Sequence, residues 1–190
     1  MYKGRVLAGM IIGFSTLAYL CIGGIFGIVI FSFGFLGVIC SNSELYETNV
    51  LNLDSIGWKE PLGIILCNLI GISLVALMFR GAGIGISAAE SLISGHLDTP
   101  ILRTLLRGIL SGLGIGILMW IYKKKESIPL LVLGIVAVLS CSLPLVSAEL
   151  VCVFLAGILS WKVVLYIVIL FCGYNIGGIL RKIIIPDQKR

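Results

Sequence analysis

The stretch CSNSELYETN, Cys40 to Asn49, decides the fold, because it places two carboxylates inside an otherwise apolar part of the chain. Directly before it stands FSFGFLGVI, residues 31–39, a run without any charged side chain. Glu44 and Glu47 are costly in a lipid bilayer, where ionisable groups usually face a pathway or a partner. The stretch is therefore either a loop between two membrane helices or a deliberate break within one.

The composition around this stretch is that of an integral membrane protein. The 190 residues are 59% hydrophobic and only 12% charged, whereas a soluble domain carries about twice that share of charge. The net charge of +5 comes with basic residues at segment ends, as in YKKKE and RKIIIPDQKR. That placement is typical of membrane topology. The partner that we expect is the lipid bilayer, and not a nucleic acid.

Six stretches approach the length of about 20 apolar residues that a membrane-crossing helix needs. They run from Arg5 to Leu20, from Ile25 into the opening stretch, from Pro61 to Phe79, from Ile101 to Tyr122, from Ile128 to Ala156, and from Lys162 to Leu180. Residues 81–100 are amphipathic and are expected outside the hydrocarbon, as a short surface helix. Six spans place both termini on one side, and the excess of lysine and arginine indicates that this side is cytoplasmic.

Three pairs of short motifs recur in the same order, each pair three spans apart. They are Gly9/Gly13 with Gly108/Gly112, NSEL (residues 42–45) with SAEL (residues 147–150), and Asn68/Gly71 with Asn175/Gly178. Because three spans is an odd number, the second half would lie inverted in the membrane. We therefore predict a single channel domain over residues 1–190, with a first repeat (1–80), a connecting loop (81–100) and an inverted second repeat (101–190). Glu44 and Glu149 are expected at equivalent positions, beside broken second and fifth helices.

These motifs together resemble the formate/nitrite transporter family over nearly the whole chain. LAGMIIGFSTLAYL is similar to that family's first helix, A-G-x-x-I-G-x-G, and FSFGFLGVICSNSELYETN to its second, F-S-x-G-L-x-L-V-x-x-x-G-A-E-L-F-T-x-N. CNLIG, LRGILSGLGIGILMW and YNIGG resemble parts of the third, fourth and last helices. The resemblance implies an all-α homopentamer of six-helix protomers with an aquaporin-like fold. Each protomer would pass small monovalent anions or their acids between two apolar constrictions.

Carried over position by position, the resemblance implies a set of pore and constriction residues: Phe31, Phe35, Leu45, Tyr46, Ile115, Val138, Leu145 and Glu149. The aromatic members could face lipid or the core instead. The departures from the family pattern bear on mechanism. Leu145 stands where the family has its central pore histidine, and Glu149 where it has asparagine. Leu145 cannot exchange protons, so a proton for the permeating anion would come from vestibule water, from Glu149, or not at all.

The polar residues near the breaks allow more than one role. Glu149 is either a pore carboxylate that exchanges protons or a cap on the backbone N–H groups where the half-helix restarts. His96 falls on the family's lysine before the fourth helix; it is a vestibule cation with a pH-dependent charge or a solvated loop residue. Glu47 replaces the family's threonine and faces either the vestibule or the protomer interface. The residues expected to support the break loops are Glu44, Asn68 and Asn175.

The sequence thus favours a channel or transporter for a small monovalent anion or its neutral acid, of the formate, nitrite or hydrosulfide type. The alternatives are a pore for a small neutral or cationic solute, such as water or ammonia/ammonium, and a non-transporting membrane assembly subunit. We do not expect an enzyme, because no nucleophile–base pair can be named. The six cysteines follow neither metal nor disulfide spacing, so no metal or cofactor is expected.

Overall fold

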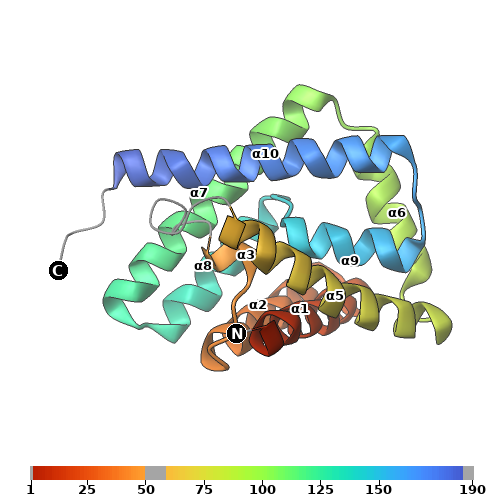
Figure 1. Cartoon of the computed structure of the whole chain (residues 1–190), viewed down its shortest axis with the longest axis horizontal. Coiled ribbons are helices and arrows are strands. Elements are labelled where there is room, and N and C mark those ends of the chain that lie inside the picture. Colours follow the sequence, from red (N-terminus) through yellow and green to blue (C-terminus); the bar gives the residue numbers. More distant parts are fainter. Residues whose placement is uncertain (1, 50–58, 186–190) are drawn as a thin grey trace.

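The computed structural model describes residues 2–49 and 59–185, and the regular elements within these ranges are helices (Figure 1). In chain order they are α1 (Tyr2–Ile22), α2 (Gly24–Cys40), α3 (Tyr46–Asn49), α5 (Lys59–Gly81), α6 (Ile86–Leu97), α7 (Ile101–Lys125), α8 (Ile128–Ser140), α9 (Val146–Ala156) and α10 (Trp161–Ile184). Of the described helices, α1, α5, α7 and α10 are long and apolar enough to cross a membrane. The shorter apolar helices α2, α8 and α9 flank two interruptions of the chain.

The two interruptions have the same backbone form. Helix α2 ends at Cys40 and α8 ends at Ser140. Each is followed by a residue in the left-handed region, Asn42 with φ 50° and Ser142 with φ 54°. Such a conformation is uncommon outside glycine and breaks the helical hydrogen-bond ladder. The chain then restarts as α3 and as α9, so the opening stretch CSNSELYETN is a helix break.

The predicted equivalence of Glu44 and Glu149 is wrong, because the two residues stand differently at their breaks. Glu44 lies two residues before the start of α3, whereas Glu149 lies three residues after the start of α9. The NSEL and SAEL motifs are therefore out of register. Counted from the helix starts, the matching residues are Glu47 and Ser147, each the second residue of its helix.

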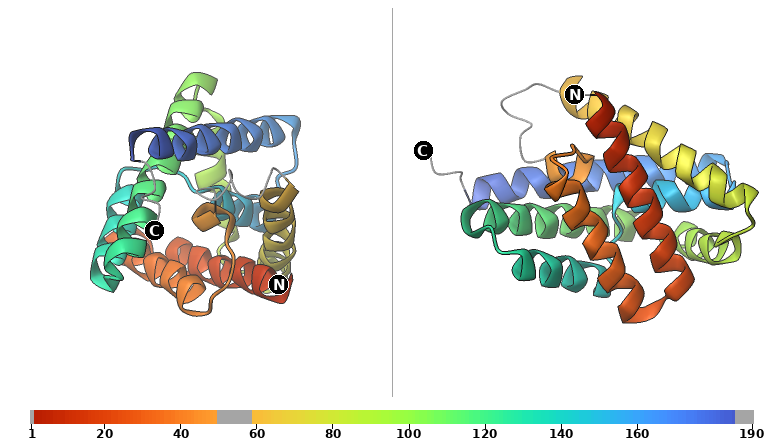
Figure 2. Two further views of the ribbon diagram at one scale, coloured as in Figure 1. Left: turned by 60° about the vertical axis from the view of Figure 1, so that its left-hand side comes forward. Right: turned by 90° about the horizontal axis from the view of Figure 1, so that it is seen from below.

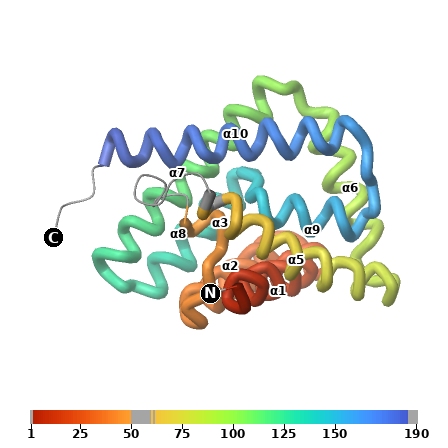
Figure 3. The backbone as a smooth tube through the Cα atoms, in the orientation of Figure 1, coloured from red at the N-terminus to blue at the C-terminus, as the bar shows by residue number. Residues whose placement is uncertain are grey.

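Half-helix α9 lies in the middle of the molecule. It contacts α1, α5, α6 and α10 as well as the short α3, and the first view of Figure 2 shows it enclosed by the longer helices. The backbone trace in Figure 3 shows α6 at the end of the molecule where α5 and α9 end and α10 begins. We call this the α6 end. As predicted for residues 81–100, the connecting segment includes a short helix, which turns the buried side chains Ala89 and Ile93 inward.

Two helix pairs pack so closely that only glycine fits between them. A Cβ atom on Gly9 of α1 would meet the backbone carbonyl of Asn68 in α5, and one on Gly71 of α5 would meet the carbonyl of Val6. Small residues at such contacts let two helix backbones approach, which is the usual basis of helix association in membranes. The α1–α5 pair therefore depends on both glycines.

The second pair, α7 and α10, repeats this packing in a register that differs from the predicted one. Gly112 meets the backbone of Tyr174, and Gly177 meets the carbonyl of Ile109. The glycine that corresponds to Gly9 is thus Gly112, one turn later than the predicted Gly108. A chain with 24 glycines offers several matches at helical spacing, and only the packing selects among them.

Replacing Gly71 with alanine is expected to destabilise the protein by roughly 1–3 kcal/mol, since overpacking at a tight contact forces the helices apart. Gly95 of α6 is the matched control, because no atom lies within 4 Å of a Cβ placed there. Gly95→Ala should leave the unfolding temperature of the purified protein unchanged or slightly higher. Equal unfolding temperatures for the two variants would contradict the packing argument.

Candidate functional site

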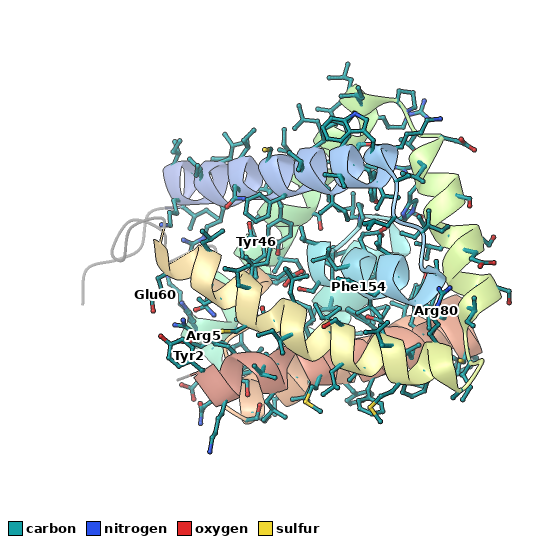
Figure 4. The ribbon with its side chains drawn as sticks, turned by 45° about the vertical axis from the view of Figure 1, so that its right-hand side comes forward. Tyr2, Arg5, Tyr46, Glu60, Arg80 and Phe154 are labelled. Atoms are coloured by element: carbon teal, nitrogen blue, oxygen red, sulfur yellow. The ribbon has the colours of Figure 1, made fainter. Side chains whose placement is uncertain are left out.

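Half-helix α9 is held at both ends by polar side chains from the first half of the chain. At its start, Glu47 accepts from the Ser147 backbone N–H at 2.6 Å and from the Ser147 hydroxyl at 2.7 Å. At its end, the Arg80 guanidinium donates to the Leu155 carbonyl at 2.9 Å; Figure 4 labels Arg80 there. A carboxylate at the start and a cation at the end both complement the helix dipole and satisfy open backbone groups.

This geometry corrects the vestibule prediction for Glu47. The side chain is 1% exposed and lies between two half-helices rather than at a solvent-filled mouth. It also takes the capping role that the sequence left open for Glu149. The two breaks of the chain therefore meet directly, through the contact between Glu47 and Ser147.

Asn68 of α5 braces the first break. Its amide oxygen accepts from the Tyr46 N–H at 2.9 Å, and its amide nitrogen donates to the carbonyls of Arg5 at 2.7 Å and Glu44 at 2.9 Å. The Glu44 side chain pairs with Arg5, which also binds Glu60 at 3.1 Å; Figure 4 shows Arg5 and Glu60 together at one end. This network satisfies the polar groups that the break leaves open.

Asn175 occupies a different setting. Its amide donates to the carbonyl of Phe171, one turn earlier in α10, at 2.7 Å. The ring of Phe171 stacks on the ring of Tyr46, with centroids 5.1 Å apart. The ring of Tyr174 also contacts Tyr46, with centroids 5.9 Å apart. This part of α10 therefore covers α3. The role of Asn175 as support for a break loop stays a prediction.

Seven of the predicted constriction residues come together in one buried apolar cluster, which we call the apolar plug. Its members are Phe31, Phe35, Leu45, Tyr46, Ile115, Val138 and Leu145. Val138 is the most exposed of them, at 9%. Phe31 and Phe35 lie one turn apart with ring centroids at 6.1 Å. These side chains face the protein interior and not lipid; their role as gates stays a prediction.

His96, Glu149 and Tyr166 form a polar cluster from three different helices, α6, α9 and α10. The Nδ1 atom of His96 lies 3.0 Å from a carboxylate oxygen of Glu149 and 3.2 Å from the hydroxyl of Tyr166. The Glu149 side chain is 6% exposed and that of His96 is 23% exposed. His96 is therefore an inward-facing helix residue, and neither reading of Glu149 from sequence included this partner.

A cavity of about 120 Å³ lies beside this cluster, and we call it the main cavity. Its wall is formed by α1, α2, α6, α8, the second break and α9, and it includes Phe31, Leu145, His96 and Glu149. The lining thus joins two members of the apolar plug to the polar cluster. A solute in this cavity would touch a titratable pair on one side and the plug on the other.

The polar cluster favours a charged histidine. Burial lowers the pKa of His96, but the hydrogen bond that it donates to Glu149 and the charge of that carboxylate outweigh burial and raise the pKa above its usual value. Arg107 on α7 opposes this with a smaller effect. His96 stands on α6, which is not among the membrane-spanning helices. His96 therefore keeps its proton to a higher pH than a free imidazole does.

Tyr166 is the member of the cluster that the sequence did not indicate. It lies within VVLYIVIL, an apolar run in which a tyrosine is equally compatible with a lipid-facing or core position. Its hydroxyl beside His96 becomes visible only when α10 is packed against α6. Helical periodicity could in principle identify a tyrosine that faces the protein interior. In this run almost every residue is apolar, so the pattern does not show which side of the helix faces inward.

Solved structures of two channels have the same fold as this chain. A pentameric formate channel with formate bound matches with a TM-score of 0.80 at 17% identity, over 94% of this chain and 92% of that chain. An FNT family ion channel matches with a TM-score of 0.81 at 15% identity, over 94% and 85%. No protein-family model matches the sequence, and no curated protein matches it in a sequence search. The predicted resemblance to formate/nitrite transporters is thus confirmed in the fold.

Proposed function

We propose that the chain is a multi-pass membrane channel of the formate/nitrite transporter family that passes a small monovalent anion or its neutral acid. The observation that carries the proposal is the His96–Glu149 pair in the wall of the main cavity, next to the apolar plug. The shared fold with two channels supports it. Formate, nitrite and hydrosulfide are the substrates that fit a cavity of this size and charge.

The mechanism follows from the cost of moving an ion through the apolar plug. An isolated charge in a low-dielectric constriction costs several kcal/mol or more, and Leu145 offers no proton there. Protonated His96 attracts the anion into the main cavity and transfers one proton to it. The neutral acid then crosses the plug, and His96 takes a new proton from water at the α6 end. Glu149 balances the imidazolium charge and holds Nδ1, which leaves Nε2 to exchange the proton.

The membrane layout belongs to the same proposal. Residues 1–80 and 101–190 form inverted repeats joined by residues 81–100, with α2/α3 and α8/α9 as the broken second and fifth spans. The two breaks with left-handed residues and the two glycine-mediated helix pairs support this layout. Both termini lie in the cytoplasm, as the lysine and arginine distribution indicates. The exposed apolar side chains of the long helices and the pentameric state of the formate channel support a homopentamer.

Flux into liposomes tests the proposal. The purified chain should carry formate, nitrite, hydrosulfide and acetate, and a proton gradient directed with the solute should accelerate uptake. Chloride should be carried far more slowly, because it is the anion of a strong acid and cannot be neutralised by a histidine. Absence of flux for every solute, with a folded oligomer present, would contradict the proposal and favour an assembly subunit.

A pore for a small neutral solute is the second candidate, and the apolar plug with Leu145 favours it. Such a pore would conduct water, ammonia or undissociated acid without current and without sensitivity to the membrane potential. It would also work equally well without the charge on His96. Measurement of flux with and without an imposed potential separates the two candidates.

A further inference from the structure

His96 has a second cavity on its other side. This cavity, of about 100 Å³, lies between α6, α7 and α10 and is lined by Lys162 and Tyr166 among others. A smaller hollow shares His96, Thr99, Thr104 and Tyr166 with it and adds Arg107. This hollow has no room for a water molecule, so a solute would occupy the 100 Å³ cavity, with Arg107 behind the shared residues. We call the two together the α7 cavity. The imidazole of His96 is thus a common wall of the main cavity and the α7 cavity.

The lining of the α7 cavity has the chemistry of an anion site. Arg107 and Lys162 supply two basic side chains, and His96 supplies a third positive charge when it is protonated. Among the described residues that line this cavity, none carries a carboxylate; Glu149 stands across the imidazole, on the side of the main cavity. The local charge therefore stays positive even when Glu149 is counted.

Hydroxyl groups complete the lining. The hydroxyls of Thr99 and Thr104 donate to the carbonyls of Gly95 and Pro100 at 3.4 Å, the long end of the hydrogen-bond range. Such weak bonds are readily exchanged for a bond to a charged acceptor, which is stronger. The Tyr166 hydroxyl lies at the same wall, beside His96. An anion in this cavity would therefore find several neutral donors as well as the cations.

We propose that the α7 cavity binds a small monovalent anion between Lys162 and His96, with the charge of Arg107 close behind, as a loading site for the main cavity. The inference rests on the proposed function, and it adds a second solute position to the path. An anion held there raises the local concentration of solute at His96, because oppositely charged walls focus a solute toward a site. A movement of the His96 side chain then connects the two cavities.

Bromide is a direct probe of this site, since it is a small monovalent anion with strong anomalous scattering. Crystals of the full chain soaked in sodium bromide should show anomalous density in the 100 Å³ part of the α7 cavity, between His96 and Lys162. The density should disappear in Arg107→Gln and weaken in Lys162→Gln. This measurement requires no transport, so its result is independent of whether the channel conducts.

Flux measurements then test the loading role. Arg107→Gln should raise the formate concentration for half-maximal flux by roughly tenfold, while the rate at saturating formate changes less than about twofold. Arg103→Gln is the matched control, because Arg103 is an exposed cation one turn earlier on α7. Its replacement removes the same net charge as Arg107→Gln. It should leave both quantities unchanged.

The outcomes separate the two proposals. The loading site would be overturned if the channel conducts but shows no bromide density in the α7 cavity. It would also be overturned if Arg107→Gln and Arg103→Gln shift the half-saturating formate concentration equally. Either result would leave the channel proposal standing. Bromide density without any flux would support the anion site and contradict the channel. Lys162 is exposed, so Lys162→Gln provides a folded variant in case Arg107→Gln does not assemble.

Discussion

Replacing His96 with alanine is expected to lower formate flux into liposomes by about a hundredfold, the scale of lost general acid catalysis. The reason is that the described residues of the main-cavity wall include no other histidine, and the anion would meet the apolar plug in its charged form. Flux in this variant should also lose its dependence on pH beyond the change in the acid fraction of the solute itself. Initial uptake rates between about pH 5 and pH 8 give both results.

Glu149→Gln should move the pH profile rather than abolish flux. Glu149 raises the pKa of His96, so wild-type flux persists to higher pH and declines as the pH rises through that raised value. With a neutral glutamine the imidazolium loses its partner, its pKa falls, and the decline should appear at lower pH. Five further titratable or charged side chains face His96 or share its cavities, and they remain unchanged in this variant: Tyr19, Cys152, Tyr166, Arg107 and Lys162.

Two matched variants check the origin of this shift. Leu62→Ala alters an exposed residue of α5, and Glu90→Gln removes an exposed carboxylate from α6, the helix of His96. Neither should move the pH profile. If Glu149→Gln and wild type give the same pH profile, the polar cluster does not transfer the proton. The same conclusion follows if Glu90→Gln moves the profile as far as Glu149→Gln does.

The helix breaks were predictable from the sequence because carboxylates and a long interrupted run are anomalous in an apolar chain. The motifs around the breaks also carried the resemblance to formate/nitrite transporters, and the fold shared with two solved channels agrees with it. The register of the matching motifs was not predictable. In the sequence, Gly108 and Gly112 match Gly9 equally well. Only the close contact between the α7 and α10 backbones shows that Gly112 is the equivalent residue.

The pairing of polar residues depended on tertiary structure. The contact of Glu47 with Ser147 joins residues 100 positions apart, and neither residue has a local feature that names the other. His96 stands in a polar segment that is compatible with a solvated loop, yet α6 turns it toward Glu149. In both cases the partner of the side chain lies far away in the sequence, so only the folded chain brings the two together.

The largest effect on stability is expected for Glu47→Ala. The substitution leaves the N–H and hydroxyl of Ser147 without their acceptors at the start of α9, where Glu47 is 1% exposed. Each unsatisfied buried group costs about 1–3 kcal/mol, and the missing side chain adds a void. We expect a loss of roughly 3–5 kcal/mol, seen as a collapse of the folded yield and of the unfolding temperature in detergent.

Glu47→Gln distinguishes the hydrogen bonds from the charge. The glutamine carbonyl can still accept from the Ser147 N–H, and its amide can donate to the Ser147 hydroxyl, so most of the stability should return. Glu90→Ala removes an exposed carboxylate and should leave the unfolding temperature near that of wild type. An unfolding temperature of Glu47→Ala equal to that of Glu90→Ala would mean that the two breaks are held by packing alone. Because α9 also carries Glu149, a loss of this capping contact should shift the pH profile of flux in any Glu47 variant that still folds.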